Sequence, residues 1–423
     1  MFHLFKQWIN RLIFRIYHYS LLPLRYRINT VGIDELKKIK KGRTLRLGQN
    51  NKGVDSGHVP GFLFLANHPS HLDPILIGTT LVKEGYPVCI WTMDFVYKNP
   101  YAKFAARNND DIRTLKVPNA HEHRAFKNKY NIRRLIYRTI KGLKNGENVL
   151  FFPAGYQKFT PRDEINGKSA VEKILRLYPD VNIVFVKIHG MWGSRFSKAV
   201  GRAERSQLTG RNWFQFLKKL IKMFLFNGIF FVPKRNVIIE FVPAKESFPR
   251  TGTRQEINQY IENFYNRGYG SDGEPLQKVP DFFWKSKYTS HEYNKKGYQY
   301  DLDDVPLEIR KDVVSALAHV SHFAPQKITH NLLLDRDIGL DSLEIAEILT
   351  HLEKKYPACK KLAPNDLTTV GHLMALTAQI PIQYVPIKGS FAVVQQEAPP
   401  LVKAKETLAA SLTSFFGFFT SHQ

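Results

Sequence analysis

The sequence predicts an α/β fold, with a central mixed sheet and flanking helices, followed by a small all-α bundle. Short apolar β-prone runs alternate with stretches of helical composition from about residue 61 to residue 243. Apolar residues then recur at helical spacing between residues 306 and 379. A length of 423 residues and a hydrophobic content of 43% suit one large core plus a smaller domain, and they exclude a wholly disordered chain.

The sheet is predicted from five apolar runs, and the helices from the segments around them. The runs are residues 61–66, 86–91, 148–153, 182–190 and 236–243. Helical composition marks residues 125–144 and 169–177, and an amphipathic helix at residues 254–267 closes this domain. In the bundle that follows, residues 309–323 and 342–356 have the apolar spacing of helices.

Composition divides the chain into five parts. We expect amphipathic membrane-interface helices at 1–29, the α/β domain at 30–267, a linker at 268–304, the helical bundle at 305–379 and a tail at 380–423. The linker is rich in Gly, Pro, Tyr and polar residues and lacks periodicity. The tail is interrupted by prolines, with one short apolar helix expected near residues 408–419. It is interpreted either as a flexible end or as the beginning of a truncated further domain.

The first 29 residues mix aromatic and aliphatic side chains with Lys6, Arg11 and Arg15. Charges at this frequency leave no uninterrupted stretch of the roughly 20 apolar residues that a membrane-spanning helix needs. The small-residue cleavage site of a signal peptide is also missing. The pattern is typical of a helix that lies in the membrane interface, and the alternative is a core helix with a solvated basic edge.

The net charge is +25, and all of the excess lies outside residues 305–379, which hold nine acidic and eight basic side chains. Residues 212–233 combine three lysines with aromatic and aliphatic residues, which favours an anionic membrane surface as partner. A nucleic acid is the alternative, but zinc-finger spacing, an RNA-binding aromatic motif and a recognition helix are missing. Two distant cysteines, Cys89 and Cys359, indicate a reducing compartment. We therefore expect a peripheral or monotopic protein on the cytoplasmic face of a membrane, with no nucleic-acid partner.

Polar side chains crowd a predicted strand-to-helix turn at residues 67–73, Asn-His-Pro-Ser-His-Leu-Asp. Such turns lie at the carboxyl end of the sheet, where α/β proteins usually bind ligands. His68 can take a proton near neutral pH, while Asp73 can orient its ring and stabilise the imidazolium. The pair resembles a catalytic triad without its serine, so a substrate hydroxyl would be the nucleophile. The alternatives are a helix-capping network and a metal site of His68, His71 and Asp73, which lacks a further ligand.

This turn resembles the first signature block of the glycerolipid acyltransferase family of the 1-acylglycerol-phosphate type, in which Asn-His is followed by four residues and an Asp. About 85 residues later, residues 152–156 (Phe-Pro-Ala-Gly-Tyr) resemble the Phe-Pro-Glu-Gly block of that family, again at the end of a predicted strand. The resemblance covers roughly residues 30–265. It implies transfer of a fatty acyl group from a thioester, on a carrier protein or coenzyme A, to a hydroxyl of glycerol phosphate or a lysophospholipid.

The same resemblance implies roles for individual residues. His68 is the general base and Asp73 its orienter. The implied substrate-binding residues are Asn67, Arg113, Gly155 and Lys158. Backbone N–H groups near Gly155 would stabilise the oxyanion of the tetrahedral intermediate. Arg113 is the best match to the arginine that binds the acceptor phosphate in the family, and Lys158 and Lys168 would share that phosphate with it.

A second motif lies in the bundle, at residues 339–343, Gly-Leu-Asp-Ser-Leu. Ser342 opens a predicted amphipathic helix with acidic residues on its exposed side, and a serine helix cap is one interpretation. The motif resembles the attachment site of acyl carrier proteins, and the similarity extends over roughly residues 305–379. It implies that Ser342 carries 4′-phosphopantetheine, installed by a phosphopantetheinyl transferase and acylated by a separate loading enzyme.

The two resemblances together lead us to expect an O-acyltransferase at the membrane surface, fused to an acyl carrier domain. Its partners would be membrane lipids, a lysophospholipid acceptor and an acyl-carrier or acyl-CoA donor. The alternative is a non-catalytic membrane-docking protein that uses a degenerate acyltransferase fold to position the carrier. Ala154 favours that alternative because the family usually has Glu there, and the basic residue expected just beyond Gly155 is represented only by Lys158 and Arg162.

Overall fold

The computed structural model describes most of both predicted globular regions. The described residues are 25–49, 59–93, 112–117, 125–194, 196–199, 234–279, 293–321, 323–362, 364, 367–389 and 393–395. Of the membrane-interface helices predicted at residues 1–29, residues 1–24 lie outside the described ranges, whereas residues 26–29 belong to a strand, so the helical prediction is wrong there. The basic aromatic segment at 212–233 and the short apolar helix expected near residues 408–419 also lie outside the described ranges. None of the helices in the described ranges combines the length and apolar character needed to cross a bilayer.

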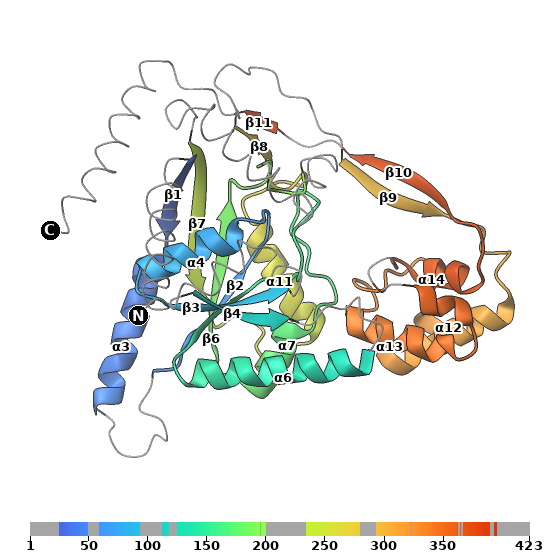
Figure 1. The fold of residues 1–423 in the computed structure, drawn as a ribbon, viewed down its shortest axis with the longest axis horizontal. Helices are drawn as coiled ribbons and strands as arrows, with labels where there is room; N and C mark the ends of the chain where they lie inside the picture. The colour runs from blue at the N-terminus through green and yellow to red at the C-terminus, as the bar shows by residue number, and fades with distance from the viewer. Residues whose placement is uncertain are drawn as a thin grey trace, which may run out of the picture.

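A mixed seven-stranded sheet forms the centre of the molecule, with strand order β1-β7-β6-β2-β5-β3-β4 (Figure 1). The strands are β1 (Tyr26–Val31), β2 (Phe62–Ala66), β3 (Val88–Met93), β4 (Ile112–Val117), β5 (Asn148–Phe151), β6 (Asn182–His189) and β7 (Arg235–Pro243). β2 to β6 are mutually parallel, while β7 pairs antiparallel with β6 and parallel with β1. The predicted mixed α/β sheet is therefore confirmed.

The five predicted strands correspond to β2, β3, β5, β6 and β7, and the two strands that the sequence did not predict lie at the two edges of the sheet. An edge strand has one solvated side and needs no continuous apolar run. In β1 only Tyr26 is buried, and β4 carries Arg113 and Lys116. Because of this polar composition, neither strand contains an apolar run from which it could be predicted.

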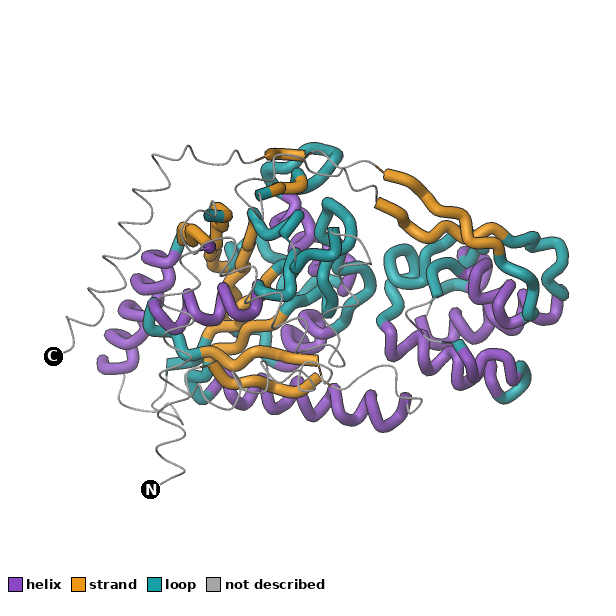
Figure 2. Tube along the Cα trace, turned by 45° about the horizontal axis from the view of Figure 1, so that its top comes forward, coloured by secondary structure: helices purple, strands orange, loops and turns teal. Residues whose placement is uncertain are grey.

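Helices cover both faces of the sheet (Figures 1 and 2). They are α3 (Ile33–Gln49), α4 (Asp73–Lys83), α6 (Ala125–Lys144), α7 (Ala170–Leu177) and α11 (Arg254–Asn266). Phe62 and Phe64 pack with α3 and α4 on one face, while Leu63 and Leu65 pack with α6, α7 and α11 on the other. β2 is thus buried on both faces, which explains why its sequence is uniformly apolar instead of alternating. The predicted helices at 125–144, 169–177 and 254–267 are found within one residue.

Residues 305–380, called the helical module below, form a second group with its own core. Its α helices are α12 (Leu307–Ser321), α13 (Ser342–Glu353) and α14 (Val370–Thr377), with 3₁₀ turns at Pro325–Lys327 and Pro357–Lys361. Val313, Leu317, Ile348 and Leu373 are fully or almost fully buried between these elements. Figure 1 shows the module beside the α/β domain, with α13 on the side that faces the domain.

The segments on either side of the helical module pair with each other. β9 (Tyr293–Gln299) and β10 (Gln383–Gly389) form an antiparallel ribbon, and β8 (Leu276–Lys278) pairs in parallel with β11 (Val393–Gln395). These strands were not predictable from sequence, because YNKKGYQ in β9 is polar and its partner lies more than 80 residues away. The chain therefore enters and leaves the module through neighbouring strands, as Figures 1 and 2 show.

Candidate active site

His68 and Asp73 form a hydrogen-bonded pair at the carboxyl end of β2. Nδ1 of His68 lies 3.0 Å from Oδ2 of Asp73, with 16% of the His68 side chain exposed and none of Asp73. Four residues lie between the two, and they come together because the chain turns through Pro69 and Ser70 before α4 begins at Asp73. The contact assigns Nδ1 to the carboxylate, which leaves Nε2 as the ring nitrogen available to a substrate.

Asp73 orients the imidazole and does not cap α4. Its Oδ2 also accepts the backbone N–H of Ser70 at 2.6 Å, inside the turn. The N-cap of α4 is Leu72, which makes no side-chain cap bond, so the helix-capping interpretation of the motif has no support in this geometry. Oδ1 of Asp73 is buried without a hydrogen-bond partner among the described residues, and carrying a charge there is costly.

Burial disfavours the charged form of both members of the pair. It lowers the pKa of His68 to about 3, with a further contribution from the positive charge of Lys198. It also raises the pKa of Asp73, against the opposing hydrogen bond from Ser70. A neutral imidazole therefore faces the substrate side near pH 7, which is the form that can accept a proton.

Asn67 holds the turn against the neighbouring strand. Its side-chain Oδ1 accepts the N–H of Ile188 at 2.8 Å, and its Nδ2 donates to the carbonyl of Ile188 at 3.1 Å. Nδ2 also lies 3.4 Å from Oδ2 of Asp163. The side chain thus continues the pairing of β2 with β6 for one more step. It is 3% exposed, so the structure gives it a positioning role next to His68.

Lys158 lies in a buried charge cluster instead of on an open surface. Its Nζ is 3.0 Å from Oδ2 of Asp163 and 2.5 Å from Oε2 of Glu274, and all three side chains are at most 6% exposed. Burial acts to lower the pKa of Lys158, but the two carboxylates outweigh it and raise the pKa. Because its ammonium already has two anionic partners, the geometry does not offer it to an acceptor phosphate.

The second motif block meets the first because β2 and β5 are adjacent and parallel, with Leu65 opposite Phe151. The Phe152 ring stacks on His68 at a centroid distance of 4.3 Å, and the N–H of Lys158 donates to the carbonyl of His68 at 3.0 Å. Residues far apart in sequence are therefore brought together around one imidazole. The sequence placed each block after a predicted strand, and the structure adds that these two strands are neighbours.

Gly155 has the left-handed conformation that only glycine adopts at low cost, with φ at +72°. Its N–H donates to the carbonyl of Phe152 at 2.9 Å and closes the turn. That N–H is accordingly engaged in the turn and is not directed at an oxyanion. A Cβ at this position would meet no atom within 4 Å, so the outer face of the turn is open to an approaching substrate.

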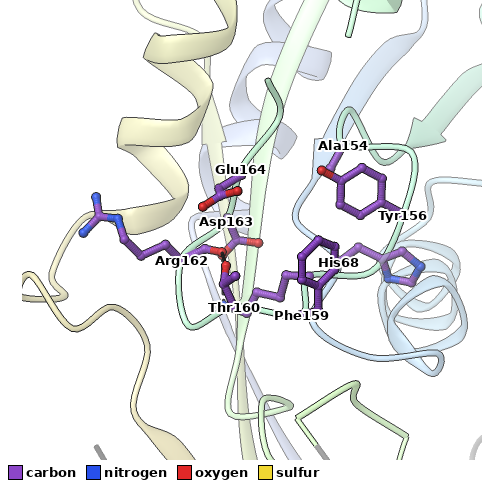
Figure 3. A pocket seen from close by; sticks show the side chains of 9 residues that line it. His68, Ala154, Tyr156, Phe159, Thr160, Arg162, Asp163 and Glu164 are labelled. Atoms are coloured by element: carbon purple, nitrogen blue, oxygen red, sulfur yellow. Dashed lines mark hydrogen bonds and ion pairs between the residues drawn. The ribbon is translucent and has the colours of Figure 1, made fainter. Parts of the chain in front are cut away.

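A shallow hollow of ≈ 270 Å³ opens beside His68 (Figure 3). It is lined by His68, Ala154, Tyr156, Lys158, Phe159, Thr160, Arg162, Asp163 and Glu164. This volume includes space that is open to solvent, so the described residues form a shallow depression beside His68 and not a closed cavity. In Figure 3 the Arg162 guanidinium points away from the His68 ring.

Arg113 lies apart from this site. It is the second residue of the edge strand β4, level with Cys89 in β3, whereas the site lies beyond the opposite ends of the strands. Its guanidinium pairs with Glu147 at 3.1 Å. The structure does not bring Arg113 to His68, and its expected phosphate contact has no support in the geometry.

Lys198 is a site cation that sequence reasoning missed. Its Nζ lies 5.9 Å from the centroid of Tyr156 and 5.6 Å from that of Phe159, both lining the hollow. Its charge is also close enough to lower the pKa of His68. The one signal available was position, since Lys198 follows the predicted strand at 182–190 and so comes from the same edge of the sheet. Glu274 had no such signal, because it lies in the segment interpreted as a linker.

The described ranges contain no group of three or more His, Cys, Asp or Glu side chains that could hold a metal ion. No protein-family model matches the chain, and a search of curated proteins finds no match. The two motif blocks and the geometry around His68 are thus the features that bear on function.

Proposed function

We propose that the α/β domain is an O-acyltransferase that moves a fatty acyl group from a thioester to the hydroxyl of a lysophospholipid or glycerol phosphate at a membrane surface. The observation that carries the proposal is the His68–Asp73 pair. A neutral, oriented imidazole stands at the mouth of an open hollow, against the second motif block. A buried carboxylate on Nδ1 is the arrangement that prepares Nε2 to remove a proton.

The reaction conserves atoms and charge with His68 as proton carrier. Nε2 takes the proton of the acceptor hydroxyl while the hydroxyl oxygen attacks the thioester carbonyl carbon. Asp73 stabilises the imidazolium that forms. The tetrahedral intermediate then collapses, the carbon–sulfur bond breaks, and the leaving sulfur receives the proton from His68. The products are an ester and a free thiol, and no external oxidant or reductant is needed.

Acceptor binding is assigned to Lys198 in this proposal. Tyr156, Phe159 and Lys198 combine aromatic surface and a positive charge beside the base, which suits an amphiphile with a phosphate near its hydroxyl. The small hollow fits this role because the acyl chains would remain in the membrane. The basic excess of the chain supports a location at an anionic membrane surface.

The helical module is proposed to be an acyl carrier domain, and the residues around Ser342 fit that role. Asp341 Oδ1 accepts the N–H of Glu344 at 2.9 Å, and Glu344 Oε2 accepts the N–H of Asp341 at 2.8 Å. Asp341 therefore caps α13, so the helix start needs no hydroxyl at position 342. A 4′-phosphopantetheine on Ser342 would supply the thiol that holds the acyl group as a thioester.

The test is acyl transfer by purified protein to 1-acyl-glycerol-3-phosphate in vesicles, with acyl-CoA and an acyl-loaded carrier as alternative donors. We expect wild-type transfer, and losses in kcat of roughly a hundredfold or more for His68→Ala, as expected for a general base. Asp73→Asn should reduce kcat while leaving substrate affinity almost unchanged. If no donor and acceptor pair supports transfer, the non-catalytic docking function, to which Ala154 points, replaces this proposal.

A further inference from the structure

The helical module contacts the α/β domain through ion pairs and hydrogen bonds around α11. Arg254, the first residue of α11, donates from Nη1 and Nη2 to the two carboxylate oxygens of Glu344 in α13, at 2.7 and 2.9 Å. Nη1 also donates to the carbonyl of Gly339 at 2.6 Å. Such a two-pronged arginine–carboxylate contact fixes orientation as well as distance. Less than a quarter of either charged side chain is exposed, which reduces screening by water.

A second group of contacts involves Asp341, the residue immediately before Ser342. Its Oδ2 accepts the hydroxyl of Ser169, and Nζ of Lys173 lies 3.3 Å from the same oxygen. Asp341 is 6% exposed, so this contact is buried. Ser169 and Lys173 belong to the start of α7, which follows directly on the loop that lines the hollow. The end of α13 that begins with Ser342 is therefore the end held against the α/β domain.

The two surfaces also fit closely at a glycine. A Cβ added to Gly167 would lie 2.5 Å from the carbonyl oxygen of Leu340 and 2.6 Å from that of Asp335. Both are backbone atoms of the module loop that leads to Ser342, and neither can move like a side-chain tip. Only a residue without a side chain permits this approach. The interface is thus shaped for this loop and does not depend on charge alone.

The contact region continues towards His68. The Nζ of Lys168 lies 5.5 Å from the ring centroid of Tyr156, which lines the hollow. Burial lowers the pKa of Lys168, and the carboxylates of Asp341 and Asp335 oppose that change, which places this lysine near the module as well. Lys168 therefore follows a residue that contacts the module loop and lies near an aromatic ring of the hollow.

We infer that this interface is a productive docking site and that the acyl donor of this enzyme is its own helical module, presented in cis. The inference rests on the proposed function and identifies the donor for that same site. Arg254, Lys173 and Ser169 hold the loop and α13, and the region of Lys168 and Tyr156 gives an anionic, elongated prosthetic arm a route to His68. The β9–β10 ribbon pairs the two ends of the module with each other, and the chain that continues from them tethers the module to the α/β domain between encounters.

Docking is tested first without any acyl transfer, by amide hydrogen exchange of the full-length protein. We expect residues 166–173 and 335–344 to be protected in the wild type and to exchange faster in Gly167→Ala. Gly270→Ala is the matched control, because a Cβ there meets nothing within 4 Å. Equal exchange in these two variants, or absence of protection in the wild type, overturns the inference.

The Arg254–Glu344 contact gives an independent version of the same test. Arg254→Gln and Glu344→Gln should each raise interface exchange by roughly ten- to a hundredfold, the effect expected for losing charge-assisted hydrogen bonds. Gln at position 344 keeps an oxygen for the Asp341 N–H. If the contact forms in solution, the double variant should be little worse than either single variant. Fully additive effects would show that the two residues do not interact and would count against docking.

The donor role is tested with protein acylated on a phosphopantetheine at Ser342. Transfer to 1-acyl-glycerol-3-phosphate in vesicles should be first order and independent of protein concentration. A mixture of Ser342→Ala protein with loaded His68→Ala protein permits transfer only between chains. At micromolar protein it should be slower on the order of a thousandfold, since a tether gives an effective concentration on the order of millimolar.

The outcomes separate this inference from the proposed function. Equal rates in the mixture and in the wild type overturn donation in cis, while transfer that depends on His68 leaves the proposed function standing. Failure of transfer from every donor, including acyl-CoA, removes both the proposed function and the donor role. Arg254→Gln should slow transfer from the loaded module and leave transfer from acyl-CoA unchanged, and an equal loss with both donors would contradict docking.

Discussion

Replacing Lys158 with Met should destabilise the protein strongly, because the lysine neutralises two buried carboxylates. Its Nζ lies 3.0 Å from Asp163 and 2.5 Å from Glu274, whose side chains are 6% and 4% exposed. Removing one partner of a buried ion cluster leaves uncompensated charge in the interior. Such changes cost about 3–5 kcal/mol, several times the cost of losing a surface ion pair.

The measurement is urea unfolding followed by circular dichroism, with the midpoint and slope compared between wild type and Lys158→Met. A second comparison uses Glu274→Gln and the Lys158→Met/Glu274→Gln double variant. Because the substitutions act on one contact, the double variant should lose clearly less than the sum of the two single losses. A loss below about 1 kcal/mol for Lys158→Met would refute the reasoning, since that is the size expected for an exposed pair. Such a small loss would indicate that Lys158 behaves as an exposed cation, which a substrate could contact.

Three further predictions concern the site. Because burial lowers the pKa of His68 to about 3, the pH-rate profile should lack the fall in kcat/KM centred near pH 6.5 that an ordinary histidine would cause, which amounts to about thirtyfold at pH 5. Asn67→Ala should leave the Ile188 backbone groups unpaired and lower the free energy of unfolding by about 1–3 kcal/mol, measured in urea. Lys198→Met should raise KM for a phosphate-bearing acceptor by roughly tenfold in steady-state kinetics, because that is the change in affinity expected from losing one charge-assisted hydrogen bond. Arg113→Met is the control and should leave KM unchanged. An acid fall centred near pH 6.5, an unaltered midpoint for Asn67→Ala, or equal KM values for Lys198→Met and the wild type would contradict the respective prediction.

The sequence was most informative where short-range patterns decide the structure. The five internal strands are apolar runs, since residues such as Phe62 and Leu63 are buried on opposite faces, and the run is visible without any knowledge of its partners. The His68–Asp73 contact was also predictable, because both residues belong to one turn of seven residues. Both motif blocks lie after predicted strands, as expected, but that these two strands are neighbours was not predicted.

Features that depend on partners distant in sequence could not be predicted. Lys158 had the sequence context of a surface cation. Its partner Glu274 follows α11, 116 residues further along the chain, and no local pattern indicates that the two meet. Arg113 was chosen because the residues around it resemble a family motif. It lies near the start of the edge strand β4, however, and the site lies beyond the other end of the strands. β9 and β10 are polar strands whose stability comes from pairing with each other, and composition alone cannot show such a pair. The Arg254–Glu344 contact likewise joins residues that only the folded chain brings together.

The central claim, that His68 drives acyl transfer to a hydroxyl, is tested most directly by the intact mass of the acyl-loaded chain. The protein would be acylated on the phosphopantetheine of Ser342 and mixed with vesicles containing 1-acyl-glycerol-3-phosphate, and its intact mass would be followed over time by mass spectrometry. Our account predicts that the wild-type chain loses the mass of the acyl group and retains its phosphopantetheine, with the diacyl product appearing in the vesicles, while His68→Ala keeps its acyl group. Loss of the acyl group at the same rate in both proteins, or retention in both, would contradict it.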